Sequence, residues 1–464
     1  MSVMEELQVA STVLLAMLIT LWSLYLNFHV WAVRAAGDYV APKGYLRRIP
    51  VVAFHIPVRG EHPSLLERVL ASIKQLKYPR DRLKVVVVCD DENPEPMMSV
   101  CREAQRDLEV VFIHRRRPKG FKAGALNEAL KVDSDVVVVL DVDSLVPHDF
   151  LVKSIPILMS SRDVAAVVAR WEPLNPNESL ISEAISFGQT FFTRRLFRGL
   201  QARLKSSVLV GNACLIKRDL LIAAGGWDER CILEDVELGV RFRVRGYRVV
   251  YNDDVAAWVE HPSTYGDFKK QQKRWACGAS QVLLKHARNV LRSRMSLLEK
   301  MSFMVYLTQY WGVSLMGLSL PLLPVLAFLG GEPMLIPLMP FLALGLATVA
   351  IYGYSFTKFH IASGERLIRT VKAMGRATAI TAAMSMDILT SSLRPLFKLK
   401  CFWRVTPKGP AKSGARGIPR LEASLMILPA LGFVASVLTK CLVLAAWSLV
   451  SLAPLAYVVV KRFS

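Results

Sequence analysis

Long apolar runs near both ends of the chain enclose a middle section in which short apolar runs alternate with amphipathic stretches. Each long run approaches the roughly 20 apolar residues that a helix needs to cross a bilayer. The runs predict five membrane spans, at about 10–32, 303–329, 334–357, 422–439 and 441–460. The pattern therefore predicts a multi-pass protein of the cell membrane with a large water-exposed domain between its first two spans.

A sixth stretch, 371–393, is apolar enough to enter lipid but also carries charged residues. Lys372, Arg376 and Asp387 lie within it, together with many small residues. A helix of mixed apolar and charged character is typical of the membrane interface. We interpret this stretch as an interfacial helix, with a sixth span as the alternative.

The middle section, from about residue 48 to 260, has the pattern of an α/β domain. Short apolar runs predict strands at Val51–Ile56, Lys84–Cys89, Glu109–Ile113, Val136–Leu140, Ala165–Ala169 and Val208–Ile216. Between the first two strands, apolar residues recur at helical spacing, at Leu65, Leu66, Val69, Leu70, Ile73 and Leu76. Alternating strands and helices predict parallel pairing in a doubly wound, nucleotide-binding fold. In such sheets, ligands bind outside the carboxyl ends of the strands.

After Pro262 the pattern changes to amphipathic helices, around 265–291 and 365–395, which are expected to lie along the membrane surface. Residues 407–419 are rich in Pro, Gly and Lys and predict a flexible basic loop. The predicted units are an N-terminal anchor, the α/β domain, interfacial helices, a hairpin of spans, an interfacial helix with a loop, and a second hairpin. Their boundaries are 1–35, 36–262, 263–300, 301–360, 361–420 and 421–464.

The formal net charge of +21 would suit a nucleic-acid partner, but the basic residues flank the predicted spans instead. Arg34 and Arg48 follow the first span, and the segment 358–420 is strongly basic. Positive loops stay in the cytoplasm, so we expect the α/β domain inside, the N-terminus outside, membrane lipid as a partner and no nucleic acid. Glu5 and Glu6 stand where a secretory leader is basic, so the first span is expected to remain as an anchor.

The cysteines form no CxxC pair and have no histidine at zinc-binding spacing. Most of them lie in apolar surroundings, which favours a buried and reduced state. The seven are Cys89, Cys101, Cys214, Cys231, Cys277, Cys401 and Cys441.

Asp141 and Asp143 end the apolar run that starts at Val136. In an extended strand the intervening Val142 points to the opposite face, so both carboxylates would face one side. Carboxylate oxygens are preferred ligands of Mg²⁺ and Mn²⁺, and these ions neutralise a nucleotide diphosphate. We therefore predict that Asp141 and Asp143 hold the metal and that Asp141 contacts the diphosphate, with a solvated strand end as the alternative.

Two further polar sites follow strands of the same sheet. Asp90 and Asp91 end the second strand and are predicted to contact the nucleotide. The alternative is a turn with helix-capping acids, which is the usual structure of such acidic clusters. Lys122 begins a helix before the metal-site strand, where its ammonium group and the helix N-terminus would approach a phosphate. Taken alone, Lys122 would be an ordinary surface residue.

Glu234 and Asp235 lie between apolar residues, just before a helix. Capping of that helix is one interpretation. The other is catalytic, with Asp235 as the general base that deprotonates an acceptor hydroxyl. We include Glu234 with Asp235 in the predicted catalytic pair.

Gln271, Arg274 and Trp275 fall at i, i+3 and i+4, which places them on one helix face. An arginine fork binds diphosphate oxygens, glutamine adds a neutral hydrogen bond, and an indole ring supports a sugar ring. A tryptophan of the membrane interface beside a snorkelling arginine is the alternative. The sequence Gly211-Asn212-Ala213 is a weaker candidate for backbone contacts to the acceptor.

These motifs and their order along the chain resemble those of the family 2 glycosyltransferases, and within that family those of the membrane-embedded cellulose synthase and hyaluronan synthase type. The resemblance covers residues 55–409. It implies a GT-A-type, nucleotide-sugar-binding α/β domain inserted in an α-helical transmembrane bundle with interfacial amphipathic helices. It also implies that Asp90 or Asp91 contacts uridine, that Trp275 stacks on the acceptor, and that Asp235 is the base. Contacts to the nucleotide and its diphosphate are implied for Lys122, Asp141, Gln271 and Arg274.

Residues 403–409 resemble the gating loop of cellulose synthases, which enters the active site when donor is bound. Trp403, Thr406 and Lys408 are therefore expected to bind substrate, with Trp403 standing where that family usually has phenylalanine. The chain departs from the family pattern in having one predicted span before the α/β domain and fewer spans after it.

The resemblance implies an inverting hexosyltransferase that uses Mg²⁺ or Mn²⁺. It would move a sugar from a UDP-sugar to a growing polysaccharide and translocate the product across the membrane. One alternative is a non-processive enzyme that glycosylates a membrane lipid. Another is a catalytically silent transport or assembly subunit, which usually lacks the acidic residues that this chain retains.

Overall fold

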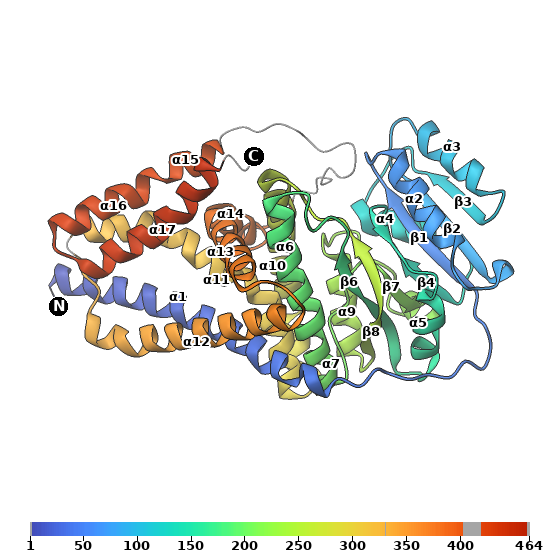
Figure 1. Cartoon of the computed structure of the whole chain (residues 1–464), viewed down its shortest axis with the longest axis horizontal. Helices are drawn as coiled ribbons and strands as arrows, with labels where there is room; N and C mark the ends of the chain where they lie inside the picture. Colours follow the sequence, from blue (N-terminus) through green and yellow to red (C-terminus); the bar gives the residue numbers. More distant parts are fainter. Residues whose placement is uncertain (1, 330, 402–418, 462–464) are drawn as a thin grey trace.

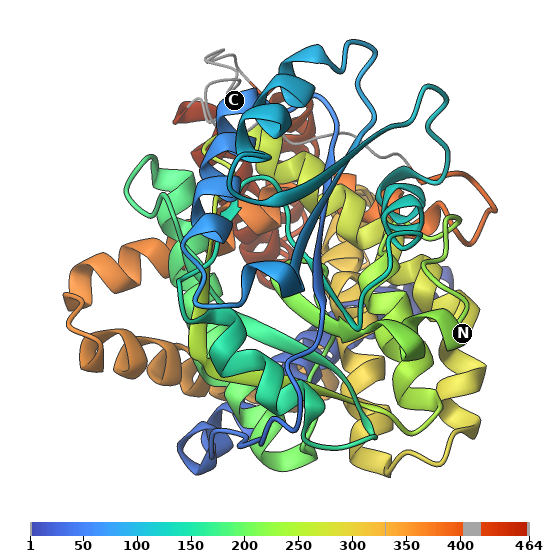
Figure 2. The ribbon, with the colours of Figure 1, turned by 90° about the vertical axis from the view of Figure 1, so that its right-hand side faces the viewer.

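The computed structural model describes residues 2–329, 331–401 and 419–461. An α/β domain lies at one end of the elongated molecule and a bundle of long helices at the other (Figure 1). Figure 2 views the molecule from the α/β end, with the sheet in front of the bundle. The predicted division into a sheet domain and an apolar helical part is confirmed.

The α/β domain is built on one mixed sheet, which in the described part of the chain has the strand order β3-β2-β1-β4-β7-β6-β8-β5. Strands β1 to β4 pair in parallel, as predicted. Valine-rich strands such as these, with both faces buried, are typical of the centre of an α/β sheet. The strands are β1 Val52–Val58, β2 Leu83–Cys89, β3 Glu109–His114, β4 Val136–Val139, β5 Ser144–Leu145, β6 Val164–Pro173, β7 Cys214–Lys217 and β8 Arg248–Val259.

Two strand predictions need correction. The predicted strand at Val208–Ile216 begins only at Cys214, and β7 runs antiparallel to both β4 and β6. An apolar run does not encode strand direction, and here the preceding helices return the chain to the opposite end of the sheet. The sequence pattern also missed β8, because Asn252, Asp253 and Asp254 interrupt its apolar run. A register shift occurs where β8 pairs with β6 near this polar segment.

Helices cover both faces of the sheet. In α2 (Pro63–Lys74) the residues predicted at helical spacing are buried, and His62 caps the helix by accepting from the Ser64 N–H. The other helices of the α/β domain are α3 Glu95–Ala104, α4 Phe121–Ala129, α5 Phe150–Met159, α8 Arg218–Ala223 and α9 Glu234–Val244, with short turns η1 Ala35–Asp38 and η2 Arg80–Arg82. A helical excursion between β6 and β7 comprises α6 Leu180–Phe191, the π-helical η3 Phe192–Phe197 and α7 Arg198–Leu204.

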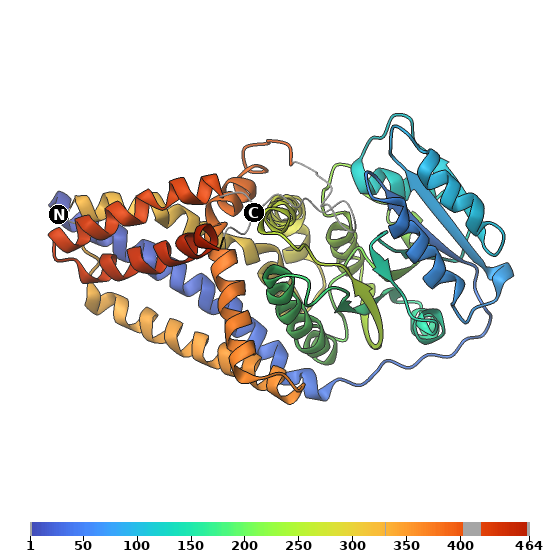
Figure 3. The same cartoon turned by 45° about the horizontal axis from the view of Figure 1, so that its top comes forward.

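Within the described residues, five helices are long and apolar enough to cross a membrane, at the five predicted positions. Helix α1 packs against α12, and α11 packs against α16, which pairs with α17. These helices run side by side along the length of the molecule (Figure 3). Their bounds are α1 Val3–Arg34, α11 Leu297–Phe328, α12 Leu335–Ala362, α16 Ile427–Leu438 and α17 Leu442–Val460, with the short α15 Arg420–Leu425 before the last hairpin.

The ambiguous stretch 371–393 does not form a sixth span in the described structure, because the chain breaks at Met384 into α13 (Leu367–Ala383) and α14 (Ser385–Leu393). Its charges have partners on helices that connect the bundle to the sheet domain. Arg376 pairs with Glu183 on α6, and Asp387 accepts from Lys273 on α10 (Tyr265–Arg292) at 2.6 Å. Helices α6 and α10 lie crosswise to the bundle, between it and the sheet (Figure 1).

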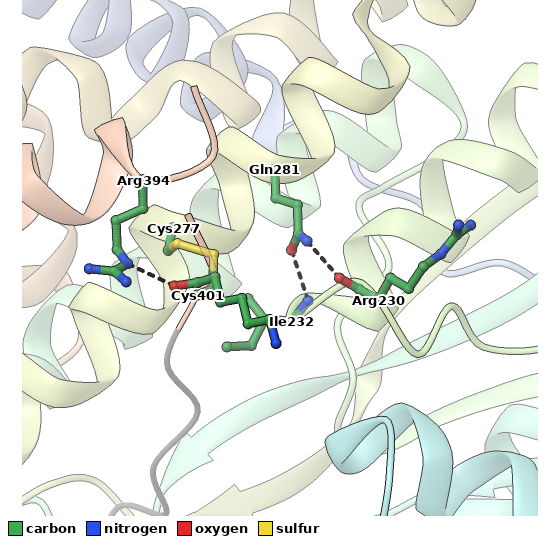
Figure 4. The surroundings of a disulfide bond; sticks show 7 residues. Arg230, Ile232, Cys277, Gln281, Arg394 and Cys401 are labelled. Carbon is green, nitrogen blue, oxygen red and sulfur yellow. Dashed lines mark hydrogen bonds between the residues drawn. A yellow bond between two sulfur atoms is a disulfide. The ribbon is translucent and has the colours of Figure 1, made fainter. Parts of the chain in front are cut away.

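The expectation that all seven cysteines are reduced is wrong for two of them. A disulfide joins Cys277 on α10 to Cys401, 124 residues further along the chain (Figure 4). The two cysteines lie in unrelated sequence contexts, and only the docking of α10 against the segment after α14 brings them together. The other five cysteines are free and buried, as predicted.

Candidate active site

The sequence Asp141-Val142-Asp143 forms a turn between β4 and β5, in which the Asp141 carbonyl accepts from the Ser144 N–H at 3.1 Å. The predicted extended geometry is therefore wrong, because the chain must turn here to start the strand that pairs with β8. Asp141 is partly exposed, whereas Asp143 is buried and accepts from the Ser144 hydroxyl at 3.1 Å.

Lys122 lies at the centre of a group of acidic residues. Its Nζ atom donates to Asp141 Oδ1 at 2.6 Å and to the Gly211 carbonyl at 2.8 Å, and lies 3.8 Å from Glu234 Oε1. Burial acts to lower the pKa of Lys122, but the neighbouring carboxylates raise it above its ordinary value. Lys122 is therefore a charged, largely buried lysine at the start of α4, with its side chain 18% exposed and paired with carboxylates.

The loop before β7 holds the two acidic motifs together. The Asp141 N–H donates to Asn212 Oδ1 at 3.0 Å, and Asn212 Nδ2 donates to the Ser144 hydroxyl at 2.7 Å. The Gly211 N–H donates to Asp235 Oδ2 at 2.5 Å. A Cβ atom at Gly211 would lie only 2.8 Å from that same oxygen, so the contact requires glycine. From the sequence, Gly211 and Asn212 were only weak candidates for the site, because their contacts with Asp235 and Asp141 form only in the folded sheet.

Glu234 and Asp235 lie in the first turn of α9. The N-cap residue of this helix is Leu233, so neither acid occupies the capping position. Asp235 Oδ1 accepts from the Val236 N–H at 2.8 Å, so both carboxylate oxygens accept from backbone donors. Burial raises the pKa of Asp235, while Lys122 and the backbone donors act to lower it. Burial raises the pKa of Glu234 to about 7, opposed by Lys122 and reinforced by Asp235. The catalytic role of the pair stays a prediction.

Helix α10 brings a second cation to these acids. Burial lowers the pKa of Arg274, and the charges of Glu234, Asp141 and Asp235 counteract that effect. Arg274 therefore lies within electrostatic reach of the acidic group. Gln271 and Trp275 are half-buried on the same helix. Lys122, Asp141, Gly211, Asp235 and Arg274 thus converge from five separate segments of the chain.

The end of β2 forms a second part of the site. Arg115 donates to both carboxylate oxygens of Asp90, through Nε at 2.6 Å and through Nη2 at 2.5 Å, and this pair is buried. Asp91 Oδ1 accepts from the Gly60 N–H at 2.5 Å. The Asp90 carboxylate is therefore paired with Arg115, and Asp91, which follows β2, contacts the turn after β1.

Comparison with known proteins identifies the domain. Residues 50–278 match the family model described as "Glycosyltransferase like family 2". The chain carries a family 2 glycosyltransferase domain. The predicted enzyme class, a family 2 hexosyltransferase, and the GT-A-like fold are thereby confirmed.

Several proteins are similar to this glycosyltransferase. A "Probable glycosyltransferase" of Sulfolobus acidocaldarius is 27% identical over 376 residues, 78% of each chain. "Glucomannan 4-beta-mannosyltransferase 1" of Oryza sativa subsp. japonica is 31% identical over 271 residues, 55% of this chain and 51% of the plant protein. The chain thus spans about half the length of this plant relative. The fold is similar to "Mannosyltransferase PcManGT from Pyrobaculum calidifontis in complex with GDP-Man and Mn2+", at 23% identity and a TM-score of 0.55, covering 83% and 99% of the two chains.

Asp141 and Asp143, the predicted metal ligands, do not form a complete metal site by themselves. Among the described residues, no group of three or more His, Cys, Asp or Glu side chains is placed to hold a metal ion. Asp141 and Asp143 supply two carboxylates, whereas Mg²⁺ prefers six oxygen ligands and usually takes several from phosphates and water. The donor set fits a divalent ion that binds together with a nucleotide diphosphate.

Sequence reasoning missed two residues of the glycosyltransferase site. Glu61 follows β1, and burial raises its pKa to about 7, with added repulsion from Asp91 and Asp141. Arg115 anchors the loop after β3 by donating to the carbonyls of Lys119 and Phe121 as well as to Asp90. Both residues stand just after strand ends, which is the signal that could have revealed them.

The three predicted contacts in the gating-like loop, Trp403, Thr406 and Lys408, lie outside the described residues of the glycosyltransferase. Their predicted roles stay predictions. Cys401, which forms the disulfide with α10, is the last residue described before this segment.

Proposed function

We propose that this glycosyltransferase is an inverting mannosyltransferase that transfers mannose from GDP-mannose to the end of a growing polysaccharide at the membrane. The mannose assignment is supported by the rice relative, whose name gives a mannosyltransferase of glucomannan. The structural neighbour with GDP-mannose and Mn²⁺ in its title suggests guanosine in place of the UDP-sugar expected from the sequence. The domain fold itself requires only a nucleotide-sugar donor.

The partly buried carboxylate of Asp235 is the observation that carries this proposal. Both of its oxygens accept from backbone N–H groups, and the charges of two cations, Lys122 and Arg274, interact with it. Asp235 would take the proton of an acceptor hydroxyl as that oxygen attacks the anomeric carbon. The bond from the anomeric carbon to the diphosphate breaks on the opposite face, and its electron pair leaves with the diphosphate. Attack from the opposite face inverts the anomeric configuration.

The remaining side chains would bind and orient the donor. Lys122 and Arg274 would stabilise the negative charge that develops on the leaving diphosphate. A divalent ion, Mg²⁺ or Mn²⁺, held by Asp141 and Asp143, would neutralise the same phosphates when it is bound. Trp275 and Gln271, on the helix face of Arg274, would contact the acceptor sugar and the diphosphate. Asp91 and Glu61 line the nucleotide end of the site.

The membrane part supports a polysaccharide acceptor that leaves through the bundle. Helix α10, which carries Gln271, Arg274 and Trp275, packs directly against α11 and α14, so the candidate site lies next to the helical bundle. We place the glycosyltransferase domain in the cytoplasm, with the N-terminus and residues 331–333 outside, because basic residues flank the other ends of the predicted spans.

Nucleotide release by the full-length protein in lipid nanodiscs tests the proposal, with Mn²⁺ or Mg²⁺ and a panel of GDP-mannose and UDP-sugars. We expect release from GDP-mannose, β-linked mannan as the product, and loss of activity when the metal is chelated. Release from a UDP-sugar alone would overturn the donor assignment. Short lipid-linked products would overturn the polysaccharide assignment.

Replacement of the base tests the mechanism. Asp235→Asn should reduce transfer by about 10³-fold or more, because general base catalysis and correct acceptor orientation are both lost. GDP-mannose binding, measured by calorimetry, should remain. Asp81→Asn is the matched control, since the Asp81 side chain is exposed and lies on η2. Full activity in Asp235→Asn would exclude Asp235 as the base.

A further inference from the structure

One face of α10 packs against the chain segment that contains the predicted catalytic pair, Glu234 and Asp235. Arg274, Gly278, Gln281 and Lys285 follow one another at intervals of four, three and four residues, which places them along a single stripe of the helix. The charges of Glu234 and Asp235 act on Arg274. The other three residues contact the chain from 228 to 237, which leads into the catalytic pair and continues beyond it.

Gln281 uses both atoms of its amide on the loop that precedes Glu234. Its Oε1 accepts from the Ile232 N–H at 3.1 Å, and its Nε2 donates to the Arg230 carbonyl at 2.6 Å (Figure 4). Residues 231–233 belong to neither a helix nor a strand. The Cys231 N–H and the Leu233 carbonyl have backbone partners, whereas Gln281 supplies the partners of the Ile232 N–H and the Arg230 carbonyl.

The neighbouring positions of the stripe fix the same loop from both sides. A Cβ atom at Gly278 would lie 2.4 Å from Leu233 Cγ and 2.8 Å from Ile232 Cγ2, so α10 approaches the loop as closely as a glycine permits. Lys285 pairs with Asp228 and also with Glu237, the latter at 2.7 Å. The loop is thus clamped against α10 immediately before Asp235.

We propose that Gln281 is a positioning residue that holds Asp235 in place by fixing the backbone at Arg230 and Ile232. This inference rests on the proposed role of Asp235 as the base. A loosened loop would misplace the carboxylate and admit water to it, and a misplacement of about 1 Å costs about 10²-fold in rate. Donor contacts from Lys122 and Arg274 come from other segments and would be retained.

Gln281→Met tests this role, because methionine keeps the length of the side chain but forms neither hydrogen bond. In the full-length protein in nanodiscs, we expect kcat to fall by about 10- to 100-fold with an unchanged KM for GDP-mannose. The acid limb of the pH–rate profile should move to lower pH, because burial raises the pKa of Asp235 and added water reverses that effect. Gln281→Glu, which keeps the acceptor for Ile232, should recover part of kcat.

Hydrogen exchange on the same variant is independent of turnover. The amides of residues 232–236 should exchange faster in Gln281→Met, with β1 and β2 unchanged. Gln105→Met is the matched control, since Gln105 likewise donates to a backbone carbonyl, that of Val110, but on the far edge of the sheet. Unchanged exchange at 232–236, or a fall in kcat that is equal in the Gln105→Met control, would overturn the positioning role. Absence of nucleotide release in the wild type would overturn the proposed function and leave the exchange measurement to decide this inference.

Discussion

At the scale of single residues, Lys122 decides the electrostatics of the site. Three carboxylates, of Asp141, Glu234 and Asp235, act on its ammonium group within a buried region. The neighbouring carboxylates repel one another, and burial already raises the pKa values of Glu234 and Asp235. Lys122 therefore keeps this acidic group compatible with the binding of an anionic donor.

Lys122→Met should shift the acid limb of the pH–rate profile to higher pH. The lysine charge lowers the pKa of Glu234 and of Asp235, so its removal raises both, and more alkaline solution is then needed to ionise the base. The KM for the donor should rise about 10-fold or more as a phosphate contact is lost. Lys131→Met is the control, because Lys131 is exposed and pairs only with Glu128 in the described structure. An acid limb at the wild-type position would contradict this account.

At the scale of elements, the packing of α9 on α10 depends on Glu237. Its side chain is fully buried and pairs with Arg241, Lys285 and His286. Burial alone would raise the pKa of Glu237, but these partners lower it to about 2. A buried carboxylate with this many partners fixes the orientation of the helix that starts at Glu234.

Glu237→Gln should lower the unfolding temperature at pH 7 and have little effect near pH 2. A folded-state pKa below the unfolded value stabilises the fold above the unfolded value, and that stability is lost as pH falls through the folded value. A difference of roughly two units corresponds to about 3 kcal/mol in the free energy of unfolding. Thermal unfolding of both proteins between pH 3 and 8 measures the difference. A gap that stays constant across this range would show that Glu237 acts by packing alone.

At the scale of the whole molecule, the disulfide ties the catalytic helix to the membrane part. Cys277 lies one helical turn beyond Arg274, and Cys401 follows α14, which packs against α10 and α11. The bond closes a loop that includes the first hairpin of apolar helices. It therefore links the glycosyltransferase domain and the bundle covalently, in addition to the ion pairs of Asp387 and Glu422 with α10.

Reduction of the wild type should lower its unfolding temperature, whereas the Cys277→Ser/Cys401→Ser double variant should not respond to reductant. For a loop of about 120 residues, the chain-entropy account gives about 5 kcal/mol of stabilisation. Mass spectrometry of a non-reducing digest should find the two cysteine peptides joined. Detection of only free thiols at both positions would contradict the bond.

Much of the fold was predictable, because it depends on local patterns. The apolar spans, the helical spacing in α2 and the valine-rich central strands appear directly in the sequence. The direction of β7 and the existence of β8 were not predictable, since strand direction is set by the preceding helices and polar residues interrupt β8. The break at Met384, which divides α13 from α14, likewise depends on contacts with α6 and α10.

The sequence alone determined the chemical groups of the site, because strand ends, helix starts and acidic pairs carry local signals. Asp141, Asp235 and Arg274 were predicted in this way and their roles stay predictions, whereas the family match confirms the enzyme class. The tertiary structure decided how these groups are used. It buried Lys122 among three carboxylates, placed Gly211 against Asp235, paired Asp90 with Arg115 and joined Cys277 to Cys401. Each of these contacts joins residues distant in the chain, and only packing of the sheet, α9 and α10 in three dimensions brings such residues within bonding distance.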